Sequence, residues 1–155
     1  MLVSVQSKER VEEILTRHQG MEGALLPILH AVQAEFGHVP QDSLPVIAKA
    51  LNISRAEVHG VMSFYHDFRE TPAGRHVVKL CRAESCQAMG AEPLATQAQT
   101  MLGVDWHGTT PDDRVTLEPV FCLGLCACGP AGIIDGKLIG RLTGDKLTQI
   151  IEGLK

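Results

Sequence analysis

The chain has 155 residues and a formal net charge of −4, from 14 Lys and Arg against 18 Asp and Glu. This length suggests one domain or two small ones, and a hydrophobic fraction of 45% is typical of a globular protein. An acidic chain with 4 Phe, 1 Tyr and 1 Trp is a poor candidate for nucleic-acid binding, which favours basic surfaces and aromatic stacking platforms.

We expect no secretory signal, because the first residues lack an apolar run behind a basic segment. The longest uncharged apolar stretch, Val120 to Ile134, is too short for a membrane-spanning helix and is interrupted by Gly124, Gly129 and Pro130. The sequence therefore predicts a cytoplasmic protein with no membrane segment. In that reducing compartment, five cysteines more often bind metal or take part in redox chemistry than form disulfides.

Apolar residues in the first half of the chain recur at helical spacing. Four helices are predicted, around residues 11–15, 25–36, 43–52 and 54–65. Ser43 is the expected N-cap of the third helix, and Ser54 with Glu57 has the spacing of a capping box before the fourth. Tyr65 is expected on the apolar stripe of that last helix. Residues 1–74 should therefore form a helical bundle, whose apolar stripes make it the expected docking region.

Thr71 to Gly74 break the helical pattern and mark a domain boundary. The predicted elements beyond it are strands at residues 76–80 and 114–120, a hairpin at 133–139, and helices around 94–102 and 147–154. The order β-α-β, then β-β-α, fits a thioredoxin-like sheet within residues 75–155. The predicted fold class is thus α+β, a helical bundle followed by a thioredoxin-like α/β domain. The core is expected to include Met62, Met89 and Met101.

Four of the five cysteines form two local pairs, each placed just after a predicted strand. Cys81 and Cys86 form C-x4-C, and Cys122 and Cys126 form C-x3-C. In a β-α-β unit the strands run parallel, so both pairs should meet at one edge of the sheet. A [2Fe-2S] cluster takes two thiolates on each iron, which matches one pair per iron. With four thiolates it carries a charge of about −2, or about −3 after accepting one electron.

The loops around these pairs offer groups that could stabilise such a charge. We expect the backbone near Gly90, Gly124 and Gly129 to approach the sulfurs closely and donate amide hydrogen bonds. Arg82, directly after the first cysteine, is expected to offset negative charge. The seven His residues show no ligand spacing with the cysteine pairs.

Two other classes of function remain open on spacing alone. Zinc also binds four thiolates and would make this chain a zinc-stabilised interaction module, although C-x4-C with C-x3-C is atypical of structural zinc sites. A thiol–disulfide oxidoreductase is disfavoured because the chain has no C-x-x-C; Cys126 and Cys128 form only C-x-C.

Four segments together resemble one protein family: LLPILHAVQAEFGHVP, LNISRAEVHGVMSFYHDF, HVVKLCRAESC and FCLGLCACGP. The family comprises the thioredoxin-like [2Fe-2S] subunits of NADH dehydrogenases, represented in respiratory complex I by its E-type subunit. Relatives serve NAD-reducing hydrogenases and NAD-dependent, molybdenum- or tungsten-containing formate dehydrogenases. The resemblance implies a thioredoxin-like [2Fe-2S] ferredoxin domain and no metal at Cys128. The cluster ligands that it implies are Cys81, Cys86, Cys122 and Cys126.

Within this family, the chain looks most like the small gamma subunit of the formate dehydrogenases. It is compact, and its segment CRAESCQAMGAEPL differs from the T-x-C-x-x-x-G wording usual in complex I members. The resemblance implies a non-catalytic electron-transfer subunit of an enzyme that converts formate and NAD+ to CO2 and NADH. The implied partners are a subunit that binds FMN, NAD and a [4Fe-4S] cluster, and a larger molybdenum or tungsten subunit that oxidises formate. The equivalent subunit of complex I or of a hydrogenase is the alternative.

Overall fold

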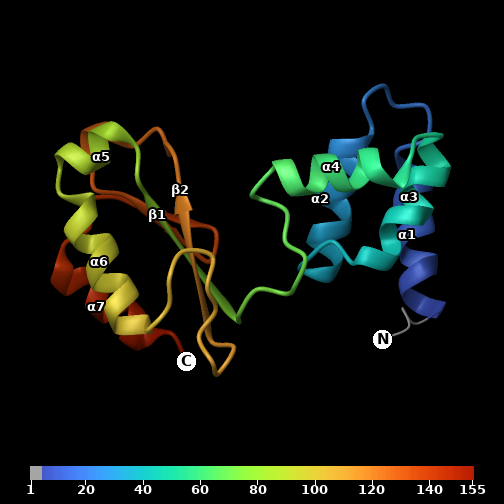
Figure 1. The fold of residues 1–155 in the computed structure, drawn as a ribbon. Helices are drawn as coiled ribbons and strands as arrows, with labels where there is room; N and C mark the ends of the chain where they lie inside the picture. Colours follow the sequence, from blue (N-terminus) through green and yellow to red (C-terminus); the bar gives the residue numbers. More distant parts are fainter. Residues whose placement is uncertain (1–4) are drawn as a thin grey trace. The chain divides into compact units, whose positions relative to one another are not determined.

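A computed structural model describes residues 5–155 of the chain (Figure 1). The chain divides into two compact units, one within residues 1–72 and the other formed by residues 73–155. Each unit has a hydrophobic core of its own.

The first unit is helical, as the spacing of its apolar residues predicts. Its elements are α1 (Val5–Arg17), α2 (Leu25–Phe36), the 3-10 turn η1 (Gln41–Ser43), α3 (Leu44–Leu51) and α4 (Arg55–Phe64). The fully buried residues Leu29, Val32 and Ile47 lie at the centre of its core. Burying apolar stripes from several short helices against one another is what stabilises elements too short to persist alone.

Of the two helix N-caps predicted for this unit, one is confirmed and one is wrong. The capping box before α4 is confirmed, with the Glu57 amide donating to Ser54 Oγ at 3.1 Å and the Ser54 amide donating to Glu57 Oε2 at 2.8 Å. The prediction that Ser43 caps α3 is wrong. Its hydroxyl donates to the Pro40 carbonyl at 2.6 Å, because a 3-10 turn leads directly into the helix and leaves the side chain facing backwards.

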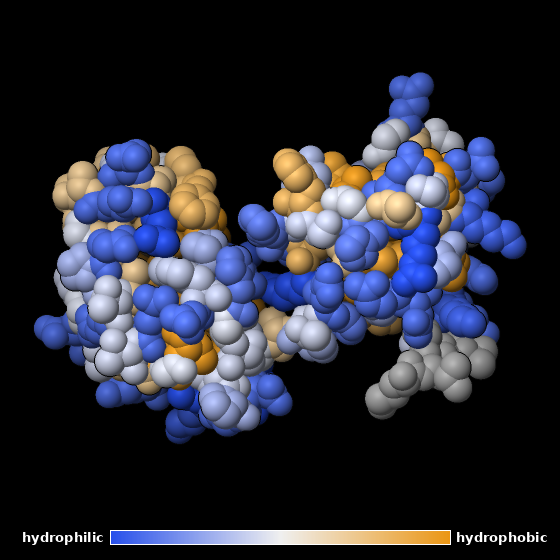
Figure 2. Space-filling model, in the orientation of Figure 1, coloured by the Kyte–Doolittle hydropathy of each residue, from blue (hydrophilic) through white to orange (hydrophobic). Residues whose placement is uncertain are grey.

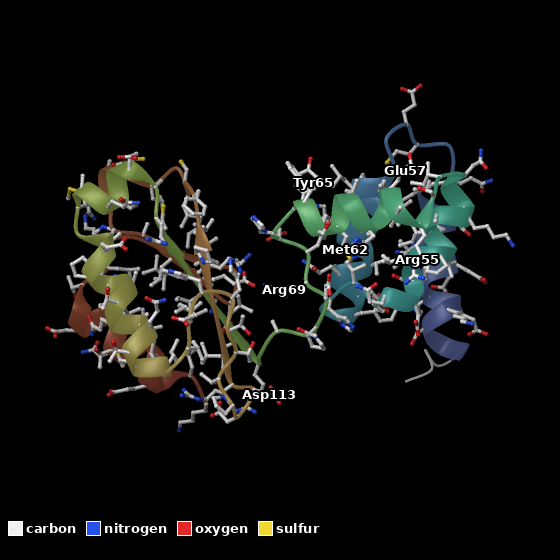
Figure 3. The ribbon with its side chains drawn as sticks, viewed as in Figure 1. Arg55, Glu57, Met62, Tyr65, Arg69 and Asp113 are labelled. Carbon is white, nitrogen blue, oxygen red and sulfur yellow. The ribbon has the colours of Figure 1, made fainter. Side chains whose placement is uncertain are left out.

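The prediction that Tyr65 lies on the apolar stripe of α4 is also wrong. The helix ends at Phe64, and Tyr65 turns into extended backbone with φ −90° and ψ 107°. Helical spacing therefore no longer decides where its side chain points, and Tyr65 is 44% exposed at the end of α4 (Figure 3). Phe64 beside it is 74% exposed, and hydrophobic side chains reach the surface over α4 (Figure 2).

The second unit is built on a four-stranded mixed sheet with the order β2-β1-β3-β4. Strand β1 (His76–Cys81) runs parallel to β2 (Val115–Val120) and antiparallel to β3 (Gly132–Ile134), which pairs with β4 (Lys137–Ile139). The predicted hairpin is confirmed, with Asp135 and Gly136 at φ 48° and 79° in the turn, the positive values that a type I′ turn requires.

Two long helices, α6 (Ala91–Leu102) and α7 (Gly144–Gly153), contact each other beside the sheet (Figure 1). Their apolar side chains share one buried core with those of the strands. Val78 and Leu117 are fully buried beneath them. A further short helix that the sequence did not predict, α5 (Glu84–Ala88), lies at the end of the sheet where β1 ends (Figure 1).

Of the three methionines expected in the core, only Met62 is buried. Met89 is 59% exposed where α5 ends, and Met101 is 38% exposed on α6. Met101 accepts a hydrogen bond from the Thr148 hydroxyl at 3.7 Å, so its sulfur packs at the surface between α6 and α7.

Candidate metal centre

The parallel pairing of β1 and β2 brings the two cysteine pairs to one edge of the sheet. Cys81, the last residue of β1, is the register partner of Val120, the last residue of β2. The Arg82 amide donates to the Val120 carbonyl at 2.8 Å, which ties the two loops together where they leave the sheet. Cys122 follows two residues later. The prediction that the pairs meet at this edge rests on parallel strands, and these are confirmed.

The first pair is buried and in mutual contact. Cys81 is 2% exposed and Cys86 is 3% exposed, and their thiols are hydrogen-bonded to each other. Helix α5 begins between them and turns the chain back, so that Cys86 faces Cys81. Gln87 closes the loop, since its side-chain amide donates to the Arg82 carbonyl at 2.7 Å and its backbone amide donates to the Ala83 carbonyl at 3.0 Å.

The second pair lies on an exposed loop beside the first. Cys122 and Cys126 are both exposed, and Cys126 begins the 3-10 turn η2 (Cys126–Cys128). The same loop reaches Cys86 at its far end, where a methyl group on Gly129 would lie 3.6 Å from the Cys86 sulfur. Gly129 thus lies close to a sulfur, as the sequence predicts.

The electrostatic surroundings favour a thiolate at Cys81. Burial is the largest influence on this thiol and opposes its ionisation. Four donors nevertheless hold the pKa of Cys81 below its ordinary value: the amides of Ala83 and Cys122, the thiol of Cys86 and the amide of Leu123. The sulfur of Cys81 therefore accepts hydrogen bonds from both loops.

The pKa of Cys86 is shifted in the opposite direction, above its ordinary value. Burial and the hydrogen bond with Cys81 raise the pKa of Cys86, and the neighbouring charges of Cys81 and Cys126 raise it further. The amide of Ala131 acts in the other direction. Ionising Cys86 beside Cys81 is therefore costly unless a cation neutralises the two sulfurs, which is the electrostatic requirement of a metal site.

The amides that donate to the cysteine sulfurs differ in part from those that the sequence predicts. The amides of Gly90 and Gly129, which were expected to donate to sulfur, donate to the carbonyls of Gln87 and Cys126. Amides of Ala83, Cys122, Leu123 and Ala131 are directed at the Cys81 and Cys86 sulfurs. Every residue except proline carries an amide, so no sequence signal marks these donors.

The side chain of Arg82 is also engaged elsewhere. Its guanidinium donates to Glu92 at 2.9 Å and stacks over the Trp106 ring at 5.2 Å. Glu92 thus neutralises part of the charge that Arg82 was expected to offer to a cluster.

The chemistry of the donor set fits an iron–sulfur cluster, because all four side chains of the two pairs are thiols. Within residues 5–155, no three His, Cys, Asp or Glu side chains are grouped so that one metal ion could bind them together. A [2Fe-2S] cluster has a different requirement, two thiolates for each of two irons, and iron–sulfur clusters are held mainly by thiolates. The two neighbouring pairs supply four thiols. Cys128, the fifth cysteine, is half-buried, and its carbonyl accepts the Arg141 amide at 2.6 Å.

A family model described as thioredoxin-like [2Fe-2S] ferredoxin matches residues 11–155. The chain belongs to this family, whose cofactor is a [2Fe-2S] cluster. The E subunit of the NADH-quinone oxidoreductase of Pseudomonas aeruginosa is 32% identical over 151 residues, covering 97% of this chain and 91% of that protein. The corresponding protein of Escherichia coli is 31% identical over 153 residues, covering 99% and 92%.

The similarity also extends to hydrogenases. A subunit of the NADP-reducing hydrogenase of Solidesulfovibrio fructosivorans is 30% identical over 130 residues, covering 84% of this chain and 76% of that protein. A solved NAD+-reducing [NiFe]-hydrogenase in the H2-reduced state shares the fold with a TM-score of 0.72 at 24% identity. The match covers 84% of this chain but 22% of that hydrogenase chain. Across residues 5–155, no helix is both long enough and apolar enough to span a membrane.

Proposed function

We propose that this chain is the electron-transfer subunit of an NAD-linked multisubunit oxidoreductase, with Cys81, Cys86, Cys122 and Cys126 as the ligands of one [2Fe-2S] cluster. The observation that carries the proposal is the meeting of two cysteine pairs in adjacent loops at the ends of two parallel strands. When bound, the cluster supplies one-electron redox chemistry. The chain's own residues hold it, keep its Cys81–Cys86 side away from water and direct amides at its sulfurs.

The proposed electron partner is a subunit that carries FMN, NAD and a [4Fe-4S] cluster. A flavin exchanges two electrons with the nicotinamide as hydride, whereas iron–sulfur centres exchange one, so a one-electron site belongs beside it. Support comes from relatives in Pseudomonas aeruginosa and Solidesulfovibrio fructosivorans, which are subunits of NADH- and NADP-linked enzymes.

For the parent enzyme, our proposal is a cytoplasmic NAD-dependent formate dehydrogenase, with a larger molybdenum or tungsten subunit that oxidises formate. Its support is the wording of the first ligand loop, CRAESCQAMGAEPL, which differs from that usual in complex I members. Complex I and an NAD-reducing hydrogenase are the alternative parents, and both appear among the similar proteins.

The helical unit is proposed as the docking region of the chain for its partner subunits. Phe64 and Tyr65 at the end of α4 are large side chains left 74% and 44% exposed, and their rings contact each other edge-on at 5.1 Å. Exposed apolar patches of this kind commonly mark protein–protein contacts.

The cluster is tested by metal and sulfide analysis with low-temperature EPR, on anaerobically purified protein before and after dithionite. We expect about two irons and two sulfides per chain and a rhombic spin-half signal that appears only on reduction. One zinc per chain with no visible absorbance would instead make the protein a structural module and overturn the proposal.

The partners are tested by affinity purification of the tagged chain from its native host. The purified complex is assayed with formate, hydrogen and NADH as electron donors, and its molybdenum, tungsten and nickel contents are measured. Formate-dependent NAD+ reduction supports the proposed parent, while hydrogen-dependent activity with nickel, or NADH–quinone activity alone, contradicts it.

Docking is tested in the same purification with Phe64→Ser, which should reduce recovery of the flavin subunit. Met21→Ser is the matched control, because Met21 is also an exposed apolar side chain of the helical unit but belongs to the loop between α1 and α2 and not to α4. Equal recovery from both variants would place docking elsewhere.

A further inference from the structure

The backbone of the second ligand loop adopts an unusual conformation on either side of Leu123. Cys122 has φ 77° and Gly124 has φ 71°, both in the left-handed region. That region suits glycine and is tolerated by Asn and Asp, but a cysteine side chain disfavours it. A residue stays in such a conformation only where its surroundings hold it there.

The surroundings of this loop show what the conformation achieves. The amides of Cys122 and Leu123, two successive residues, are both directed at the sulfur of Cys81 in the other loop. Successive amides that converge on one point form a concave site for negative charge. Both loops are fixed at their base, because the Arg82 amide is bonded to the Val120 carbonyl at 2.8 Å.

Cys81 depends on these amides because it is 2% exposed, so water cannot replace a lost donor. Hydrogen bonds to a ligand sulfur stabilise the more negative state of an iron–sulfur centre and so raise its reduction potential. A loop that turned the amides away from Cys81 would lower the potential while leaving all four cysteines in the chain.

We infer that Gly124 is a positioning residue for the cluster: its left-handed backbone holds the loop so that the Cys122 and Leu123 amides point at Cys81, and it thereby sets the reduction potential without touching the cluster. The inference rests on the proposed ligand set. It assigns to Gly124 a role through backbone direction and not through close approach. Apart from its two chain neighbours, no atom of the described residues 5–155 lies within 4 Å of the place where a side-chain Cβ would stand.

The open space at Gly124 makes the test specific. Gly124→Ala introduces no clash and acts only by disfavouring the left-handed backbone. Gly136→Ala is the matched control, because Gly136 has φ 79° and equally open space but lies in the turn between β3 and β4. Gly124→Asn is the conservative variant, since asparagine tolerates the left-handed region best among residues with a side chain.

The measurements are EPR-monitored redox titration and resonance Raman spectra of the iron–sulfur stretches, on anaerobically purified full-length protein. We expect Gly124→Ala to lower the reduction potential and shift the stretches, Gly124→Asn to lie close to the wild type, and Gly136→Ala to change neither. If Gly124→Ala binds no cluster, the comparison of Gly124→Asn with Gly136→Ala decides, because the inference requires Gly124→Asn to bind it with a near-native potential.

An unchanged potential in Gly124→Ala, or equal shifts in Gly124→Ala and Gly136→Ala, would overturn the inference while leaving the proposed function intact. A Gly124→Asn protein with no cluster or with a potential far from the wild type would overturn it as well. A wild-type protein that binds no [2Fe-2S] cluster would overturn the proposed function itself and, with it, the role of Gly124.

Discussion

Replacing Cys128 tests whether the proposed ligand set is right or whether every cysteine of the second loop binds iron. Cys128→Ser should keep both irons and the visible spectrum, because Cys128 lies outside the proposed ligand set and a serine keeps the carbonyl that accepts the Arg141 amide. Cys86→Ser or Cys122→Ser should lose iron and colour and destabilise both loops, since metal-binding energy is partly folding energy. Iron analysis and absorbance spectra check all three variants. Loss of iron from Cys128→Ser would contradict the ligand set.

His76 forms a second local network, at the far end of β1 from the cysteines. Its Nδ1 lies 2.8 Å from Asp135 Oδ2 and its Nε2 lies 3.1 Å from the Lys155 carbonyl oxygen. The bond with Asp135 and then the Lys155 carbonyl raise the pKa of His76 above its ordinary value. Burial opposes ionisation of Asp135, but His76 and the Val77 amide hold the pKa of Asp135 below its ordinary value.

The directions of these two pKa shifts predict how the contribution of the His76–Asp135 pair to the free energy of unfolding changes with pH. A raised histidine pKa gives stability that is fully present below about pH 6.5 and is lost as pH rises through the folded value. A lowered aspartate pKa gives stability that is present above about pH 3.9 and is lost as pH falls through the folded value. The unfolding free energy of the wild type should therefore exceed that of His76→Gln most between about pH 4 and 6.5. Urea titrations at several pH values measure this difference, and one that does not vary with pH would contradict the network.

The stability of helix α4 depends on Ser54, the residue that caps its N-terminus. Ser54→Ala removes the acceptor of the Glu57 amide and should lower the unfolding free energy of the helical unit by about 1 kcal/mol. Ser63→Ala is the control, because Ser63 is exposed inside the same helix and its hydroxyl donates to the Gly60 carbonyl without capping the helix. Circular dichroism during urea unfolding compares the two. Equal losses from both variants would show that the box does not stabilise α4.

Elements were predictable wherever local spacing alone decides the structure. The helices of the first unit and the strands and turn around Asp135 follow from apolar periodicity and turn chemistry. Helix α5 was missed because a helix of five residues is too short to show a period. The cysteine pairs could be placed at one edge from strand direction. The amides that point at Cys81 could not, since every residue except proline carries an amide and the left-handed backbone of Cys122 is one that a cysteine side chain disfavours.

The separate cores of the two units predict that stability and cofactor retention can be uncoupled in the whole chain. Leu29 and Leu117 are both fully buried leucines, one in each core, so replacing either by alanine should cost about 2–5 kcal/mol in its own unit. Leu117 lies in β2, the strand that leads into the second ligand loop, so Leu117→Ala should reduce the iron content and visible absorbance. Leu29→Ala should destabilise the helical unit and leave both unchanged.

The measurement is iron content and absorbance against temperature for the two variants, beside unfolding of the helices by circular dichroism. A bound cluster stabilises only the fold that supplies its ligands, so the visible absorbance should be lost when the second unit unfolds. In Leu29→Ala, the helices of the first unit should unfold at a lower temperature than the one at which the absorbance is lost. If Leu29→Ala lost its iron and visible absorbance at the same temperature as Leu117→Ala, retention of the cluster would depend on the helical unit as well. That result would contradict the proposal that one unit docks and the other carries the electron.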